Sequence, residues 1–197
     1  MSEDPRLPSQ LDTLERVPDA SPAPTPRPTA VVQVPITGSS LASLATPAIA
    51  PPVRVEIPAA GIDMGISPVG VKEDGEMEVP PNPSTAGWYR WGSAPGGETG
   101  STVVAAHVDS LEYGLGPFAQ LRSLPAGAEI FITSADGAVH RYVAATLSYY
   151  PKDQLPSTEL FERAGPERLV LITCGGSFDE TALTYSDNVI VTATPTP

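Results

Sequence analysis

The chain contains a single cysteine, Cys174, which stands where the apolar run Leu169–Thr173 ends and a Gly-Gly pair begins. Because there is no second cysteine, an internal disulfide and a four-cysteine metal site are both impossible. The thiol is therefore an inert buried group, a partner in an intermolecular bond, or a nucleophile. A strand-like run that ends in a lone cysteine followed by two glycines favours the nucleophile over the other two roles.

A cysteine nucleophile needs a base and donors for the developing oxyanion. The chain offers two histidines, His107 and His140. His107 follows the small apolar run Ser101–Ala106, and an ionisable group where a buried strand gives way to a loop is typical of catalytic residues. His140 lies beside Arg141 in a predicted hairpin strand, where alternation assigns it to the solvated face. We interpret His140 as a structural or surface residue.

Short β-like runs separated by turns fill the chain from Val53 onward. Asp-Gly pairs at 74–75 and 136–137 predict tight turns. Helical signal is limited to 117–124 and 157–163, the second with Ser157 as its N-cap. About eight short strands with few helices predict an all-β fold, either a closed barrel or a sandwich. The clearest expected strands are 53–57, 101–106, 129–133, 139–144, 169–173 and 188–193.

Residues 1–52 hold 11 of the 24 prolines among the 197 residues of the chain. Proline runs favour extended polyproline II and exclude helices, so this segment is predicted to be a largely disordered Pro/Ala/Thr-rich stalk or linker. Residues 53–194 then form one catalytic domain, a length that can bury a core of its own.

The formal net charge of −12 excludes nucleic acid as the main partner and argues against electrostatic docking to anionic lipid. The sequence holds no apolar stretch of about 18 residues that would span a bilayer. Its start, Met1–Arg6, lacks the basic and apolar regions of a signal peptide. The protein is therefore expected to be either cytosolic or preceded by a membrane segment that this sequence does not include.

An ordered set of motifs runs through the chain from Val53 to Ala193. A single piece such as Thr-Cys is a weak signal, whereas the ordered set is specific. The motifs are Ile57-Pro58 with Gly61-Ile62, Gly75–Pro80, Gly87–Tyr89, Pro95–Gly97, Ala106–Asp109, Phe118–Leu121, Pro125–Gly127, Leu171–Gly176 with Phe178-Asp179, and Tyr185–Val189. This set resembles the sortases, the cysteine transpeptidases of the Gram-positive cell surface, and most of all their actinobacterial class F.

The resemblance implies an eight-stranded β-barrel with Cys174 as nucleophile and His107 as general acid/base. The backbone at Thr173 and Gly175 would donate to the oxyanion. It also implies a reaction, which is cleavage of an LPxTG-type sorting signal between Thr and Gly through a thioacyl enzyme, followed by transfer to a cell-wall peptide amine. We expect a monomer that needs no metal or other cofactor. The full-length protein would be held by an N-terminal anchor at the outer face of an actinobacterial membrane.

One position departs from the family pattern, which places an arginine where this chain has Ser186. Arginine supplies a fixed cation with forked donors, whereas serine offers one neutral hydroxyl. Losing one oxyanion donor typically costs about 100- to 1,000-fold in rate. The serine is an engineered substitution, a natural substitution, or a change for which another basic residue supplies the missing charge. The candidates for compensation are Arg122, Arg90, Arg163 and Arg168, and we favour the two substitution hypotheses.

Two further hypotheses therefore stand beside the enzyme. The first is a sortase-fold module that binds sorting peptides with little turnover because of Ser186. The second, weaker hypothesis is a surface structural protein whose thiol is inert.

Four other features have ordinary structural interpretations that we prefer. Leu155–Glu159 differs by one residue from an LPxTG signal, but a loop leading into a short helix is favoured over a built-in pseudosubstrate. Asp109 is expected to cap a turn rather than orient the catalytic histidine. The acidic run Glu73–Glu78 lacks a full calcium-ligand spacing and is expected to be a solvated hairpin. Trp88 and Trp91 are expected to pack in the core and at corners.

Overall fold

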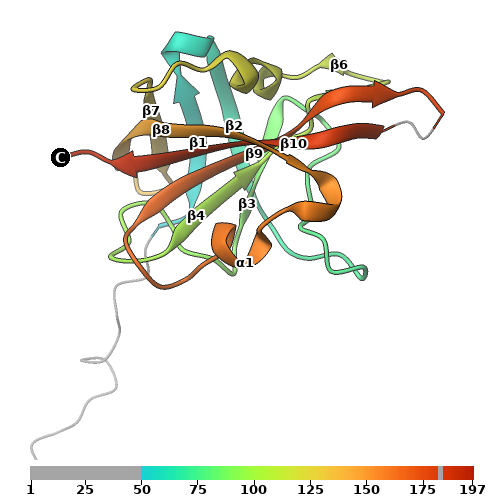
Figure 1. Cartoon of the computed structure of the whole chain (residues 1–197). Helices are drawn as coiled ribbons and strands as arrows, with labels where there is room; N and C mark the ends of the chain where they lie inside the picture. The colour runs from blue at the N-terminus through green and yellow to red at the C-terminus, as the bar shows by residue number, and fades with distance from the viewer. Residues whose placement is uncertain (1–49, 182–183) are drawn as a thin grey trace, which may run out of the picture. The chain divides into compact units, whose positions relative to one another are not determined.

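Eight strands close into a β-barrel in the computed structural model, which describes residues 50–181 and 184–197 (Figure 1). The order around the barrel is β1-β2-β3-β4-β9-β10-β8-β7, and the short strands β5 and β6 pair separately. The prediction of an all-β, eight-stranded barrel is confirmed. The bounds are β1 Pro52–Ile57, β2 Ile62–Val69, β3 Thr85–Tyr89, β4 Ser101–Ala105, β5 Asp109–Ser110, β6 Gly114–Leu115, β7 Glu129–Ser134, β8 Val139–Pro151, β9 Arg168–Asp179 and β10 Thr184–Pro195.

The barrel interior is a hydrophobic cluster to which all eight barrel strands contribute. Along β2, Ile62, Met64 and Ile66 are buried and alternate with exposed residues, as expected when one face of a strand meets the core. In β4 every residue is buried, because its second face is covered as well. The side chains on that second face belong to a separate cluster, which includes Ala105 and Ile172.

Two neighbouring pairs of strands in the barrel are parallel, namely β2 with β3 and β4 with β9. Parallel neighbours need long crossover connections. The link between β2 and β3 folds back on itself through a bridge between Val71 and Met77, with Gly75 at a positive φ of 88° in the turn. The predicted tight turn at 74–75 is therefore present, but it lies inside this crossover and not between two neighbouring barrel strands.

The connection from β8 to β9 carries the 3₁₀ helix η4, Lys152–Gln154, and the helix α1, Ser157–Leu160. Ser157 is not the N-cap that the sequence predicted, because Pro156 occupies that position. The Ser157 hydroxyl instead donates to the carbonyl of Leu155. The helix predicted over 117–124 is the 3₁₀ helix η3, Pro117–Ser123, and a further 3₁₀ turn, η2, spans Pro58–Ala60.

Strands β9 and β10 are longer than predicted and extend past the barrel as a two-stranded ribbon (Figure 1). The ladder continues from Asn188 opposite Cys174 to Thr184 opposite Asp179, with an irregularity between Tyr185 and Asp187. The outer part is polar and exposed, so it lacks the alternation from which a half-buried strand is predicted. Its position next to the thiol makes it part of the site.

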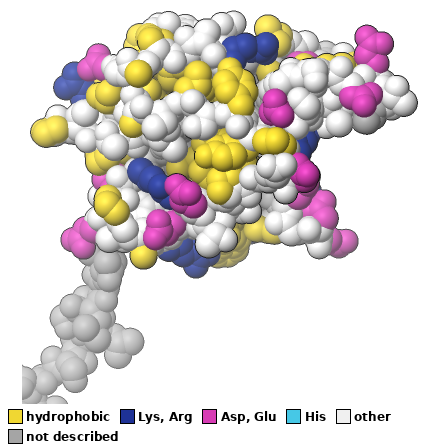
Figure 2. Space-filling view, viewed as in Figure 1, with side chains coloured by type: hydrophobic (Ala, Val, Ile, Leu, Met, Phe, Trp, Pro, Cys, Tyr) yellow, Lys and Arg dark blue, Asp and Glu magenta, His cyan; other side chains and the backbone are white. Residues whose placement is uncertain are grey.

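Within the described residues, no helix has both the length and the apolar character needed to cross a bilayer. On the face shown in Figure 2, hydrophobic side chains gather in a central patch, and acidic and basic groups lie around it. The stalk predicted for 1–52 falls almost entirely outside the described residues and stays a prediction.

Candidate active site

Cys174 lies within β9, and His107 follows the end of the neighbouring parallel strand β4. The ladder between these strands ends with Ala105 opposite Ile172, and His107 and Cys174 each come two residues later in the chain. The backbone N–H of Ala106 donates to the carbonyl of Ile172 at 3.1 Å. Strand pairing thus brings these two residues, which are far apart in the sequence, to the same region of the barrel.

Both residues line one open groove of about 790 Å³. Its floor is made by the ends of β4 and β9, and its two walls are the β2–β3 crossover and the β8–β9 connection. A groove of this size is in the range of ordinary ligand sites. The lining residues are Val71, Lys72, Gly75, Glu76, Met77, Val79, Tyr89, Ala105, Ala106, His107, Lys152, Asp153, Leu155, Ser157, Thr158, Phe161, Ile172, Thr173, Cys174 and Asn188.

Thr173 links β9 by a hydrogen bond to the residue that follows β4. Its side chain is buried, and its hydroxyl donates to the carbonyl of Ala106 at 2.8 Å. Gly175 is buried outside the groove lining, where a Cβ atom would come within 2.3 Å of the Val189 side chain. A glycine is therefore needed at 175 so that β10 can approach β9 this closely.

Ser186 lies on the exposed ribbon beyond the groove, at the irregularity in the β9–β10 ladder. Its hydroxyl accepts a hydrogen bond from the backbone N–H of Ser177 at 3.1 Å. Ser186 is two residues before Asn188, which lines the groove, but the register shift between Tyr185 and Asp187 interrupts the regular alternation of side chains between them.

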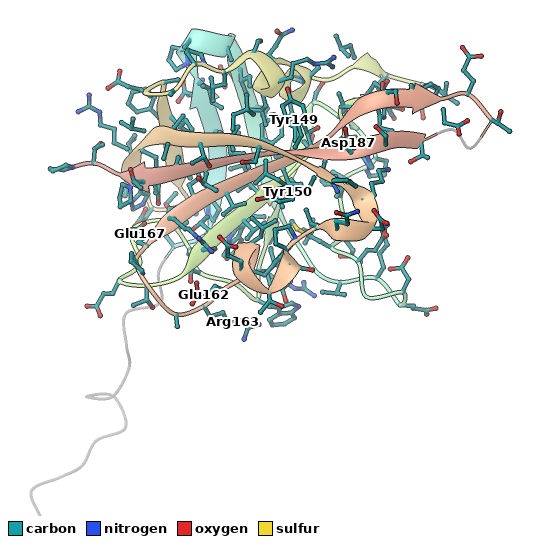
Figure 3. The ribbon with its side chains drawn as sticks, viewed as in Figure 1. Tyr149, Tyr150, Glu162, Arg163, Glu167 and Asp187 are labelled. Atoms are coloured by element: carbon teal, nitrogen blue, oxygen red, sulfur yellow. The ribbon has the colours of Figure 1, made fainter. Side chains whose placement is uncertain are left out.

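None of the four arginines considered as replacements lines the groove. Arg90 stacks over the Trp91 ring at 4.7 Å, and Arg122 donates to the carbonyl of Ala119 at 2.8 Å. Arg168 bonds Ser101 at 2.8 Å, and Figure 3 shows Arg163 beside α1, well apart from Asp187 on β10. Compensation by these arginines is therefore not supported.

The cations that do line the groove are Lys72 and Lys152, the two lysines of the chain. Sequence reasoning did not consider either as a site residue. The available signal was the scarcity of lysine, together with the position of Lys152 directly after the strand-ending Pro151.

Asp109 does not cap a turn as predicted. Its carboxylate accepts a hydrogen bond of 2.5 Å from the hydroxyl of Tyr185 on β10, and this bond raises the pKa of Tyr185. The Tyr185 ring also packs against Phe178 of β9, with 5.0 Å between the ring centres. The exposed ribbon is thus anchored to the loop that follows His107.

The remaining candidates lie as follows. His140 is half-buried outside the groove and bonds the Ser134 hydroxyl at 3.0 Å, so its structural interpretation is supported. The segment 155–159 is a loop leading into α1, as preferred, and it contributes side chains to the groove wall. Trp88 is buried, but Trp91 is 54% exposed, so the packing predicted for Trp91 is wrong.

Among the described residues, no three His, Cys, Asp or Glu side chains come together as a metal site would require.

Burial raises the pKa of the Cys174 thiol, an effect that Lys152 opposes and that Asp109 and Glu76 reinforce. Burial also lowers the pKa of His107, assisted by Lys72 and Lys152 and opposed by Asp109. Each group therefore favours its neutral form in the free protein near neutral pH. The thiolate–imidazolium pair is a minor population there.

The rate at which iodoacetamide alkylates Cys174 is therefore expected to keep rising above neutral pH, with a midpoint above that of glutathione. The reason is that only the thiolate reacts and its pKa is raised. The measurement is the pseudo-first-order rate from pH 5 to 10, followed by mass spectrometry, with glutathione in the same buffers as the reference. A plateau reached below the glutathione midpoint would contradict the assignment.

A family model described as the sortase domain matches residues 55–196. The chain belongs to the sortase family. Sortases are cell-wall transpeptidases associated with the Gram-positive surface. A search of curated proteins finds no match.

Solved structures of sortases share the fold of this sortase-family chain. Sortase C1 of Streptococcus agalactiae, in a lid mutant, is 22% identical with a TM-score of 0.55, and the match covers 74% of this chain and 69% of that one. Sortase C of Streptococcus pneumoniae is 22% identical with a TM-score of 0.56, covering 76% and 70%. Sortase A of Corynebacterium diphtheriae is 19% identical with a TM-score of 0.55, covering 77% and 63%. These likenesses establish the barrel but not a class.

Proposed function

We propose that this chain is a class F-like cysteine transpeptidase that cleaves an LPxTG-type sorting signal between Thr and Gly and passes the acyl group to a cell-wall peptide amine. The observation that supports the proposal is that Cys174 of β9 and His107, just after β4, line one open groove beside the paired strands β4 and β9. A nucleophile and a proton carrier side by side in a cleft are the minimum that acyl transfer requires.

In the first half-reaction, His107 takes the proton of the Cys174 thiol. The thiolate attacks the carbonyl carbon of the threonine, and a C–S bond forms as the carbonyl oxygen becomes an oxyanion. When this intermediate collapses, the C–N bond to glycine breaks, and the His107 imidazolium gives its proton to the departing amine. A thioester on Cys174 and a free glycine amine result.

In the second half-reaction, the acceptor amine attacks the thioester carbon and loses a proton to His107. The C–S bond breaks, and the new amide leaves with the acyl group while the Cys174 thiolate is regenerated. Backbone N–H groups near Thr173 and Gly175 are the proposed donors to the oxyanion in both steps. Sequestering the thioester from water would favour the amine over hydrolysis.

The groove suits an extended peptide with apolar residues ahead of the scissile bond. Ala105, Ile172, Val79 and Phe161 supply apolar lining, and the Phe161 ring meets Tyr89 edge-on with ring centres 5.1 Å apart. These side chains would bury the leucine and proline of a sorting signal. We further propose that the stalk of 1–52 holds this domain at the outer face of a Gram-positive, actinobacterial membrane.

The test is cleavage of a fluorogenic LPxTG peptide in the presence of a glycine-type amine, with wild type and Ser186→Arg compared. Wild type is expected to turn over. The arginine is expected to raise kcat/KM by about 10- to 100-fold, below the full value of a preorganised donor because the ribbon is exposed. Ser177→Arg, also on the exposed ribbon, is the matched control and is expected to give no such gain.

Two outcomes would redirect the proposal. Turnover confined to Ser186→Arg would favour the module that binds sorting peptides without processing them. If no variant forms a covalent adduct with a thiol-reactive sorting-peptide analogue, both the enzyme and the binding module are wrong.

A further inference from the structure

We propose that Lys152 is the cation of the catalytic groove, placed to stabilise the Cys174 thiolate and to donate to the carbonyl oxygen under attack. The second part of this inference rests on the proposed function, whereas the first can be tested without any peptide. Lys152 would act through its charge and its N–H groups.

Strand register places Lys152 near the thiol. Cys174 of β9 lies opposite Asn188 of β10, and Asn188 lies opposite Tyr150 of β8. These three residues form one row across three strands. Lys152 follows Tyr150 by two residues, directly after β8 ends at Pro151, and it lines the groove together with Cys174, His107 and Asn188.

One hydrogen bond directs the Lys152 ammonium toward β10. Its Nζ donates to the Thr184 hydroxyl at 2.6 Å. An ammonium has three N–H donors, so two remain for a substrate carbonyl. Thr184 lies opposite Asp179 on the ribbon, four residues before Asn188, so this bond holds the ammonium on the ribbon side of the groove.

The two groove lysines differ in how their charges are balanced. Lys72 pairs with Glu76 across 3.2 Å on the same crossover. Within residues 50–181 and 184–197, no carboxylate lies within ion-pair distance of Lys152, although its neighbour Asp153 also lines the groove. Among these residues Lys152 therefore has no carboxylate partner, whereas Lys72 has one in Glu76.

The charged groups around Cys174 act in opposite directions. Lys152 lowers the pKa of the thiol, while burial, Asp109 and Glu76 raise it. The pKa of His107 is lowered by burial first, then by Lys72 and to a smaller extent by Lys152, while Asp109 raises it. Removing the Lys152 charge would therefore make the thiolate less stable and raise the thiol pKa. A tenfold drop in thiolate at a fixed pH accompanies each unit of that rise.

The experiment compares Lys152→Gln with Arg141→Gln, which removes the same charge from the exposed, opposite end of β8, where Arg141 pairs with Glu129. The first readout is the pH dependence of Cys174 alkylation by iodoacetamide. Lys152→Gln is expected to move the midpoint upward and to slow alkylation at pH 7 about 3- to 10-fold. Arg141→Gln is expected to match wild type, and thermal melts check that both variants fold.

The second readout is kcat/KM for the LPxTG peptide. Lys152→Gln is expected to lower it by about tenfold or more, and Lys152→Arg to restore most of the loss because it keeps the charge. An unchanged alkylation profile in Lys152→Gln, or an arginine variant as poor as the glutamine variant, would overturn the inference. Failure of wild type to process the peptide, with the alkylation shift intact, would instead overturn the proposed function and leave the thiolate role of Lys152 standing.

Discussion

Cys174→Ala is expected to abolish processing of the sorting peptide, lowering the rate by about 10,000-fold or more, as removal of a catalytic nucleophile typically does. The chain has no other thiol that can take over. The half-buried thiol has no hydrogen-bond partner among the described residues, so the alanine variant should fold normally. The measurement is peptide cleavage by chromatography, with the thioacyl adduct sought by mass spectrometry.

The companion control is Cys174→Ser, which keeps the shape of the side chain but has a far weaker nucleophile. It is also expected to be inactive while binding the uncleaved peptide as wild type does. Cleavage at more than about one hundredth of the wild-type rate in either variant would show that the nucleophile lies elsewhere.

His107→Gln is expected to slow formation of the thioacyl enzyme by about 100- to 10,000-fold. Without the imidazole, the proposed carrier of the thiol proton and of the proton for the departing glycine amine is lost. The defect should shrink when the scissile amide is replaced by an activated ester, because a good leaving group departs without a proton. Single-turnover rates with both substrates measure this difference.

The matched control uses the other histidine of the chain. His140→Gln alters a side chain that bonds Ser134 outside the groove, so both substrates should react at wild-type rates. An equal loss for the amide and the ester in His107→Gln would indicate that His107 positions the peptide and does not transfer protons.

The strands that could be predicted are those whose composition follows the burial pattern. β4 and the inner half of β9 are continuous apolar runs because both their faces are covered. Strands β2 and β3 were not predicted, because they contain weak strand formers, namely Gly65, Ser67, Pro68 and Gly87. Pairing between the two strands in the barrel holds these residues in place. The short helices were found, but Pro156 displaced the predicted cap.

The residues of the candidate site also differ in whether the sequence alone could predict them. Cys174 and His107 could be proposed because local strand-end motifs mark them. Lys152 and the bond between Asp109 and Tyr185 could not, because each depends on which strands become neighbours in the barrel. Ser186 was noticed only as a departure from a family pattern, and its exposed position on the ribbon needed the structure.

The parallel pairing of β4 with β9 also determines when the candidate active site forms during folding. It joins Ser101 to Arg168 and runs to Ala105 and Ile172, two residues before the candidate catalytic pair. The intervening chain includes two barrel strands, β7 and β8, and three helical elements, η3, η4 and α1. Pairings between such distant segments form slowly, because loop closure must precede any gain from contact. An incompletely folded chain would expose the thiol without its histidine, so the proposed acyl transfer would begin only once the barrel has closed.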